Sequence, residues 1–117
     1  QVRQAALVRQ RRTNQPGGYW IAAATPEAAY HAVTGQCRRT GPDRVRRVAL
    51  LTDGASCAVD RFCLLDWPGL LDLVTEHGPR ELLRRVRVAE SADPAGEHQP
   101  RYKRHDDASV ALCRFEE

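Results

Sequence analysis

The sequence contains no methionine, only four cysteines and no long apolar run. Since methionine is missing even at position 1, we expect that the chain was processed or cut from a longer one. The cysteines, at positions 37, 57, 63 and 113, lack the C-x-x-C spacing of zinc sites and are too few for a disulfide scaffold, so we expect reduced, half-buried thiols. No run approaches the roughly 20 apolar residues that a bilayer requires, and the first residues lack a signal-peptide cleavage site. These absences predict a cytoplasmic protein without a membrane partner.

An excess of one charge is also missing, because 18 basic residues stand against 15 acidic ones and leave a net charge of +3. The basic residues are scattered, and few aromatic residues lie among them, unlike the surfaces that bind nucleic acids. We therefore expect solvated surface charges and no nucleic-acid partner. The length is sufficient for one core, which predicts a single domain over 1–117.

Patterns in the first part of the chain predict a helix, a strand and a short helical turn. Apolar residues at helical spacing predict a helix over 2–12, which stops at "NQPGG". The stretch "YWIAAA" (19–24) favours a strand. "TPE" (25–27) offers an N-cap, a proline and an acid for a helical turn, although the residues that follow could equally be extended. Residues 38–47 read as a charged connector.

The second part of the chain predicts two helices between two strands. "VALLTDG" (48–54) is a continuous apolar run that predicts a buried strand ending in a tight turn. The region 66–92 predicts two helices separated by "HGP", with Asp66 as the cap of the first. A polar loop over 93–104 and an alternating strand over 108–115 complete the pattern.

Carboxylates stand at one end of each of these two strands. Asp53 ends the first strand, and Asp106 and Asp107 precede the second. If the strands are antiparallel neighbours, the end of one meets the beginning of the other, and Asp53 converges with Asp106. Oxygen ligands without nearby histidine or cysteine select hard cations such as Mg²⁺ or Mn²⁺. Gly54 would let the backbone turn sharply beside the ion.

Each acidic site also has a simpler interpretation. Asp-Gly is a common turn dipeptide, and Asp-Asp before a strand is typical of a solvated loop with an Asx-turn. Asp60 and Asp66 are weaker candidates for metal binding, because both can cap helices. Spacing alone leaves the metal site and the turn both open.

Two motifs in this order resemble the C-terminal half of bacterial type 2C (PPM-type) metal-dependent Ser/Thr protein phosphatases. They are "VALLTDGAS" and "PRYKRHDDASVALC". The segments "GGYWIAAATPEAAYHAVTG" and "GPRELLRRVRVAESADP" are also similar to parts of this family, so the likeness covers nearly the whole chain. The resemblance implies an α+β fold that is part of an α/β/β/α sandwich, in which antiparallel sheets with flanking helices hold the metals between them.

The resemblance also implies the roles of individual residues. Asp53 and Asp106 match metal ligands, Asp107 and Gly54 have supporting roles, and no residue of this chain is assigned a catalytic role. The implied cofactors are Mn²⁺ or Mg²⁺, and the implied substrate is a phosphoprotein. A water activated by the metals would hydrolyse phosphoserine or phosphothreonine without a covalent phosphoenzyme.

The sequence departs from the family in one respect that decides activity. The family's first half supplies an early aspartate, a first Asp-Gly motif and a basic residue for the phosphate, and this chain begins where the second half begins. Two carboxylates completed by water are a poor site for a hard cation, so we expect weak or no metal binding and no phosphatase activity from this chain alone. We also expect a complementing segment or subunit to cover the apolar strands "YWIAAA" and "VALLTDG".

The main hypothesis is therefore the C-terminal portion of a metal-dependent Ser/Thr phosphatase, incomplete by itself. The alternative is a non-catalytic, phosphatase-like binding or regulatory module that holds a protein partner through its exposed sheet or its arginines. A nucleic-acid binder ranks third.

Overall fold

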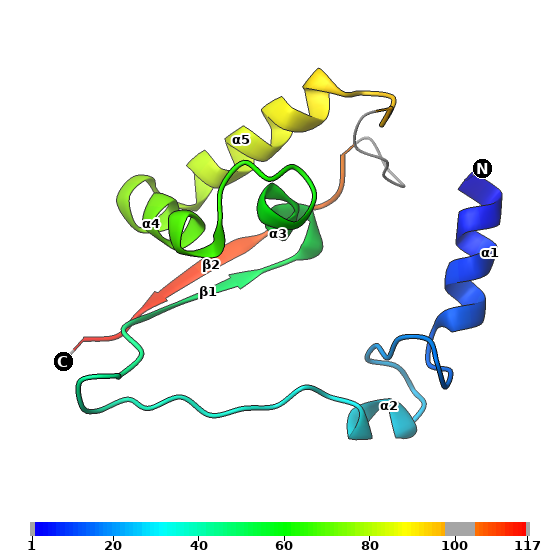
Figure 1. Cartoon of the computed structure of the whole chain (residues 1–117), viewed down its shortest axis with the longest axis horizontal. Helices are drawn as coiled ribbons and strands as arrows, with labels where there is room; N and C mark the ends of the chain where they lie inside the picture. The colour runs from blue at the N-terminus through cyan, green and yellow to red at the C-terminus, as the bar shows by residue number, and fades with distance from the viewer. Residues whose placement is uncertain (1, 98–104, 117) are drawn as a thin grey trace. The chain divides into compact units, whose positions relative to one another are not determined.

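The computed structural model describes residues 2–97 and 105–116, which belong to two compact units (Figure 1). The first unit comprises Gln1–Cys37 and the second comprises Arg38–Glu117. Helices and one antiparallel sheet occur in mixed order, which confirms the α+β class. The single domain over 1–117 and the sandwich architecture stay predictions. No helix in the described ranges has the length and apolar character to cross a membrane.

The described residues of the first unit form two helices. Helix α1 (Val2–Arg12) confirms the predicted helix, and Thr13 follows it with its hydroxyl donating to the Arg9 carbonyl at 2.7 Å. Helix α2 (Glu27–Tyr30) is the predicted helical turn. The side chain of Thr25 does not cap it; instead, the Thr25 carbonyl accepts the Ala28 N–H at 3.2 Å.

The predicted strand over 19–24 is wrong. These residues form no strand in the described part of the first unit, and they contribute only an isolated bridge between Thr13 and Tyr19. The Ile21 N–H donates instead to the Asn14 side-chain oxygen at 2.8 Å. Aromatic and β-branched residues favour a strand only where a neighbouring strand supplies hydrogen-bond partners, and here a local loop supplies them.

The second unit places helices against a two-stranded sheet. Strand β1 (Arg47–Leu51) pairs with strand β2 (Val110–Arg114) in antiparallel register, with Leu51 opposite Val110. Between them the chain forms α3 (Asp53–Asp60), α4 (Trp67–His77) and α5 (Pro79–Ala92). The two strands are thus antiparallel neighbours, which meets the condition on which the convergence of Asp53 and Asp106 depends. Of the predicted polar loop over 93–104, residues 98–104 lie outside the described residues.

Two signals within 66–92 act as predicted. The Asp66 carboxylate accepts the Gly69 N–H at 2.8 Å, which caps the start of α4. Gly78 then separates α4 from α5 with a φ of 87°, a conformation that favours glycine. The two predicted helices are therefore confirmed.

The core of the second unit lies between the three helices and one face of the sheet (Figure 1). Its buried members are Cys57 and Ala58 of α3, Leu70, Leu73 and Val74 of α4, and Leu82 and Val86 of α5. Alternate strand residues pack against them, namely Ala49, Leu51, Val110 and Leu112. Because the strands alternate, their other side chains point away from this core. The prediction of a buried first strand is therefore wrong, because within the described residues of this unit the helices cover one face and Leu50 on the other face is 60% exposed.

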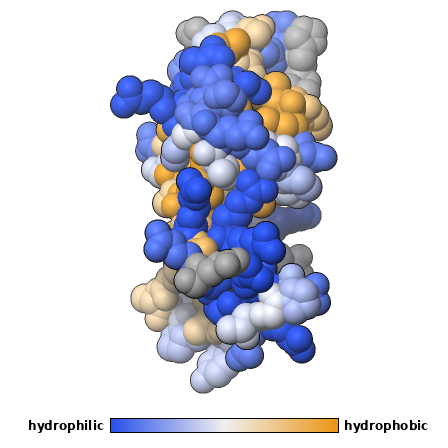
Figure 2. Space-filling model, turned by 90° about the vertical axis from the view of Figure 1, so that its left-hand side faces the viewer, coloured by the Kyte–Doolittle hydropathy of each residue, from blue (hydrophilic) through white to orange (hydrophobic). Residues whose placement is uncertain are grey.

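Apolar side chains also reach the surface. The face in Figure 2 is mainly hydrophilic, with smaller apolar patches between the polar residues. The side chain of Leu50 in β1 is 60% exposed, and those of Val33 and Tyr30 in the first unit are also exposed. The four thiols are free as predicted, but only Cys57 is buried while the other three are exposed.

Candidate metal centre

The carboxyl end of β1 and the segment before β2 lie side by side. Beyond the sheet register, the Thr52 N–H donates to the Ser109 carbonyl at 3.1 Å. The Ser109 N–H donates to the Thr52 hydroxyl oxygen at 2.9 Å. These bonds bring the segment that contains Asp53 next to the segment that contains Asp106 and Asp107, as the antiparallel arrangement requires.

Asp53 does not end a strand in a tight turn, as the sequence predicts, but starts α3. The Thr52 carbonyl accepts the N–H groups of Ala55 and Ser56, each at 2.9 Å, and this begins the helix. An acid in the first turn is favourable because the helix dipole leaves partial positive charge there. The N-terminal position leaves the Asp53 carboxylate exposed to solvent.

Gly54 brings the first turn of α3 against the backbone of residues 107 and 108. A Cβ atom at Gly54 would lie 2.2 Å from the Asp107 carbonyl oxygen and 2.9 Å from its carbonyl carbon. No side chain fits at these distances. Gly54 has no positive φ, so the prediction of a sharp turn is wrong. The position needs glycine because two backbones approach each other closely.

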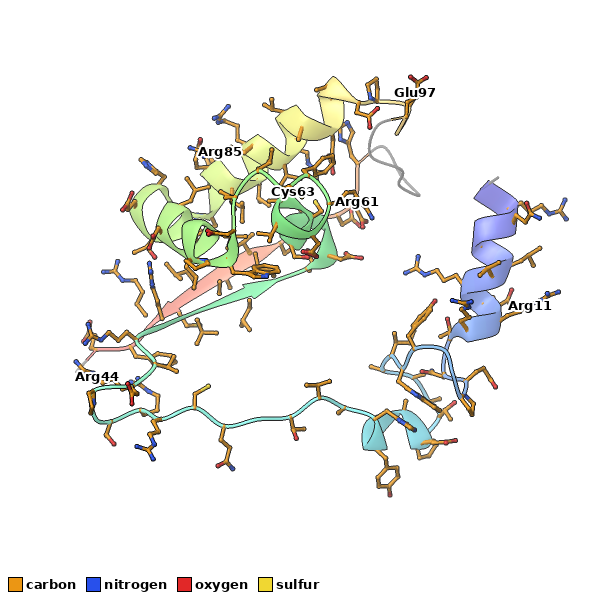
Figure 3. All side chains as sticks on the ribbon, viewed as in Figure 1. Arg11, Arg44, Arg61, Cys63, Arg85 and Glu97 are labelled. Carbon is orange, nitrogen blue, oxygen red and sulfur yellow. The ribbon has the colours of Figure 1, made fainter. Side chains whose placement is uncertain are left out.

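A shallow hollow lies beside Asp53 on α3. Cys57, Asp60 and Arg61 line it together with Asp53, and Figure 3 shows Arg61 just after the helix. Asp60 is the last residue of α3 and accepts the Ser56 hydroxyl at 3.1 Å, so its place is at the end of a helix. Burial comes first among the causes that raise the pKa of the Cys57 thiol, and the negative charge of Glu90 adds to it. Arg61 is the cation of this hollow, and no sequence motif singled it out.

Asp106 and Asp107 differ in their surroundings. Asp106 is half-buried, its side chain accepts the Asp107 N–H at 2.9 Å, and its carbonyl accepts an N–H of Arg87 at 2.7 Å. Asp107 is exposed. The bond from the Asp107 N–H resembles the local Asx-type contact of the simpler interpretation. The position of Asp106 is nevertheless set by a partner distant in the sequence.

The possible metal ligands of this region are of the type that a hard cation prefers, but they are too few to complete its coordination. Carboxylate and carbonyl oxygens are the ligands that Mg²⁺ and Mn²⁺ prefer. However, within residues 2–97 and 105–116 no group of three or more His, Cys, Asp or Glu side chains is placed to hold a metal ion. Because Mg²⁺ requires near-octahedral coordination, Asp53 and Asp106 would leave most positions to other donors.

A buried carboxylate next to this region is not part of either of the two sequence motifs. Glu90 of α5 is only 2% exposed, and its Oε2 atom lies 2.8 Å from the Arg87 Nη1 and 2.5 Å from the His105 Nδ1. Burial alone would raise the pKa of Glu90, but the hydrogen bonds from His105 and Arg87 outweigh burial and lower the pKa. The signal was present in the spacing, since Glu90 follows Leu82 and Val86 at intervals of one helical turn on the buried stripe.

Comparison with known proteins adds no relative. No protein-family model matches this chain, and neither a curated protein nor a solved structure matches it.

Proposed function

We propose that this chain is the C-terminal portion of a bacterial, cytoplasmic, PPM-type Ser/Thr protein phosphatase, inactive by itself. The observation that carries the proposal is the approach of the Asp53 segment to the Asp106 segment, through the bonds of Thr52 and the close contact of Gly54. The two motifs that resemble the family are far apart in the sequence. Their meeting at one end of the sheet is what a shared site needs.

In this proposal Asp53 and Asp106 bind Mn²⁺ or Mg²⁺, and Gly54 and Asp107 support them. In a complete domain the metals would supply an activated water for hydrolysis of a phosphoserine or phosphothreonine of a phosphoprotein. Asp53 and Asp106 would leave most coordination positions of the ion to other donors, so we expect weak binding of the metal and no turnover of substrate.

The proposal also predicts that a second sheet packs on the face of the sheet opposite the helices. Val48, Leu50, Ala111 and Cys113 alternate with the core-facing residues of β1 and β2, and Leu50 pairs with Ala111 across the strands. All four are apolar, although polar residues are the rule on a sheet face that water covers. This supports a sandwich in which a second sheet, from a complementing segment or subunit, packs on this face.

A second candidate is a non-catalytic, phosphatase-like binding or regulatory module. Two observations favour it, namely the small number of metal donors in the described part of the chain and the exposure of Leu50. In this case the same apolar face would bind a protein partner. The two candidates differ in whether Asp53 and Asp106 bind a metal ion.

Calorimetric titration of the full chain with Mn²⁺ tests the proposal. We expect weak, saturable binding that disappears in the double variant Asp53→Asn, Asp106→Asn. These substitutions keep the side-chain volume and remove the negative charge. The control is Asp43→Asn, which removes an exposed carboxylate from the connector before β1. Equal binding by the parent and the double variant, or none by the parent, would overturn the metal assignment and favour the binding module.

A further inference from the structure

Arg87 of α5 joins two groups that are distant in the sequence. Its Nη1 donates to the Glu90 carboxylate at 2.8 Å, and its Nη2 donates to the Asp106 carbonyl at 2.7 Å. One guanidinium therefore connects the helix to the segment that leads into β2. The same Glu90 oxygen lies 2.5 Å from the Nδ1 of His105, the residue next to Asp106.

Glu90 gives Arg87 a rigid support. Its side chain is 3% exposed, and it lies on the helix face that also buries Leu82 and Val86. A buried carboxylate that is hydrogen-bonded to a guanidinium is costly to separate from it. Arg87 is thus held on one side by the core of the unit, whereas 41% of its own side chain remains exposed.

The segment 105–109 is consequently attached at both ends. Arg87 and Glu90 hold it at His105 and Asp106, and Thr52 holds it at Ser109. Between these attachments the backbone of residues 107 and 108 passes against Gly54. A segment held in this way presents Asp106 in one position relative to the start of α3.

We propose that Arg87, oriented by Glu90, is a positioning residue that fixes the segment 105–109 and thereby the carboxylate of Asp106. The effect on metal binding rests on the proposed function, but the attachment of the segment does not. A planar guanidinium offers two separate N–H donors in a fixed arrangement, whereas a lysine ammonium cannot reproduce this fork. Lysine at this position should restore the contact with one group only.

Hydrogen exchange followed by NMR on the metal-free full chain tests the attachment. In Arg87→Met, we expect the Asp107 and Ser109 amides to exchange on the order of tenfold faster, because a charged hydrogen bond to this segment is lost. The Leu70 amide of α4, which donates to the carbonyl of the N-cap residue Asp66, should keep its rate. Arg87→Lys should give an intermediate rate.

The matched control is Arg84→Met on the same helix. Arg84 is paired with Glu81 at 2.8 Å, so its loss should leave the Asp107 and Ser109 amides unchanged. If Arg87→Met perturbs the whole unit, Glu90→Gln tests the same support with almost no change of volume, and it should accelerate the same two amides. Unchanged exchange of these amides in both variants would overturn the proposal.

Mn²⁺ titration of the same variants separates this inference from the proposed function. If the parent binds Mn²⁺, Arg87→Met should weaken binding several-fold, Arg87→Lys should recover part of it, and Arg84→Met should not change it. Binding by Arg87→Met as tight as that of the parent would overturn the positioning of Asp106. If the parent binds no Mn²⁺ but the variants show the faster exchange, Asp53 and Asp106 are not metal ligands. In that case the attachment of the segment 105–109 by Arg87 is still supported.

Discussion

At the scale of residues, the structural role of most positions in the candidate site depends on contacts with residues that are distant in the sequence. Asp66 is the exception, because its cap involves Gly69 only three residues later, and the sequence alone predicts it correctly. Gly54 belongs to the other kind. The Asp-Gly dipeptide that it forms with Asp53 suggests a turn. The position requires glycine, however, because the backbone of Asp107 lies too close for a Cβ atom.

Substitution of Gly54 by alanine should therefore be harmful although alanine favours helices. A methyl group would lie 2.2 Å from the Asp107 carbonyl oxygen, and one of the two backbones must move. We expect the free energy of unfolding to fall by about 1–3 kcal/mol, as for other overpacked sites. Urea denaturation measures this change.

The control is Gly35→Ala, because an added Cβ there meets no atom within 4 Å and Gly35 has no positive φ. It should leave the free energy of unfolding within about 0.5 kcal/mol of the parent. Equal stability of the parent and Gly54→Ala would contradict the close approach of α3 to the segment before β2.

At the scale of elements, α5 shows how one helix serves different purposes on its two faces. The buried face carries Leu82 and Val86 and then Glu90, which contacts the segment before β2. On the exposed side, Glu81 accepts hydrogen bonds from Arg84 and Arg85, and Figure 3 shows Arg85 on the outside of the helix. Pairs at this spacing stabilise a helix by small amounts.

The Glu81 pairs should make stability depend on pH in acid. Hydrogen bonds from Arg84 and Arg85 lower the pKa of Glu81 to about 2, from its usual value of 4.5. A lowered carboxyl pKa adds stability that is complete above the unfolded pKa and is lost as the pH falls through the folded value. Stability contributed by Glu81 should thus decline between about pH 4.5 and pH 2.

Urea denaturation of the parent and of Glu81→Gln across this pH range checks the prediction. The difference between the two should shrink as the pH falls, and it should be smaller at high salt because the pairs are open to solvent. A difference that stays constant with pH would mean that the carboxylate charge of Glu81 contributes nothing.

At the scale of the whole molecule, among the described residues of the second unit, the helices cover one face of the sheet. Leu51 and Leu112 contact the helices, whereas Leu50 is 60% exposed on the opposite face. Exposed apolar sheet faces promote association. The exposure of Leu50 therefore supports the proposal that a complementing segment covers this face.

Leu50→Glu should reduce self-association of the full chain with little change in its stability. The side chain is mostly exposed already, so we expect a change of no more than about 0.5 kcal/mol in the free energy of unfolding. Sedimentation velocity at increasing protein concentration measures association. The matched control is Leu51→Ala on the covered face, which should cost about 2 kcal/mol and leave association unchanged.

Self-association of Leu50→Glu equal to that of the parent would contradict the assignment of this face as a contact surface. A large loss of stability in the same variant would contradict the exposure of Leu50. The two measurements therefore test separate statements about the sheet.

The sequence by itself determined the elements whose signals are local. The cap at Asp66, the break at "HGP" and the apolar spacing of 66–92 predict α4 and α5. The apolar run of 48–54 predicts β1, and the alternating pattern of 108–115 predicts β2. Helix α3 has no comparable signal, because its eight residues include a glycine at the second position and few strong helix formers. Its packing through Cys57 and Ala58 compensates for this low propensity.

Only the tertiary structure decided which residues meet at the candidate metal centre. The approach of Gly54 to Asp107, the bonds between Thr52 and Ser109, and the hold of Arg87 on Asp106 all join positions that are distant along the chain. The predicted strand over 19–24 failed for the same reason, since strand propensity needs a neighbouring strand. Propensity and capping act within a few residues, whereas a site depends on how the folded chain brings separate segments together.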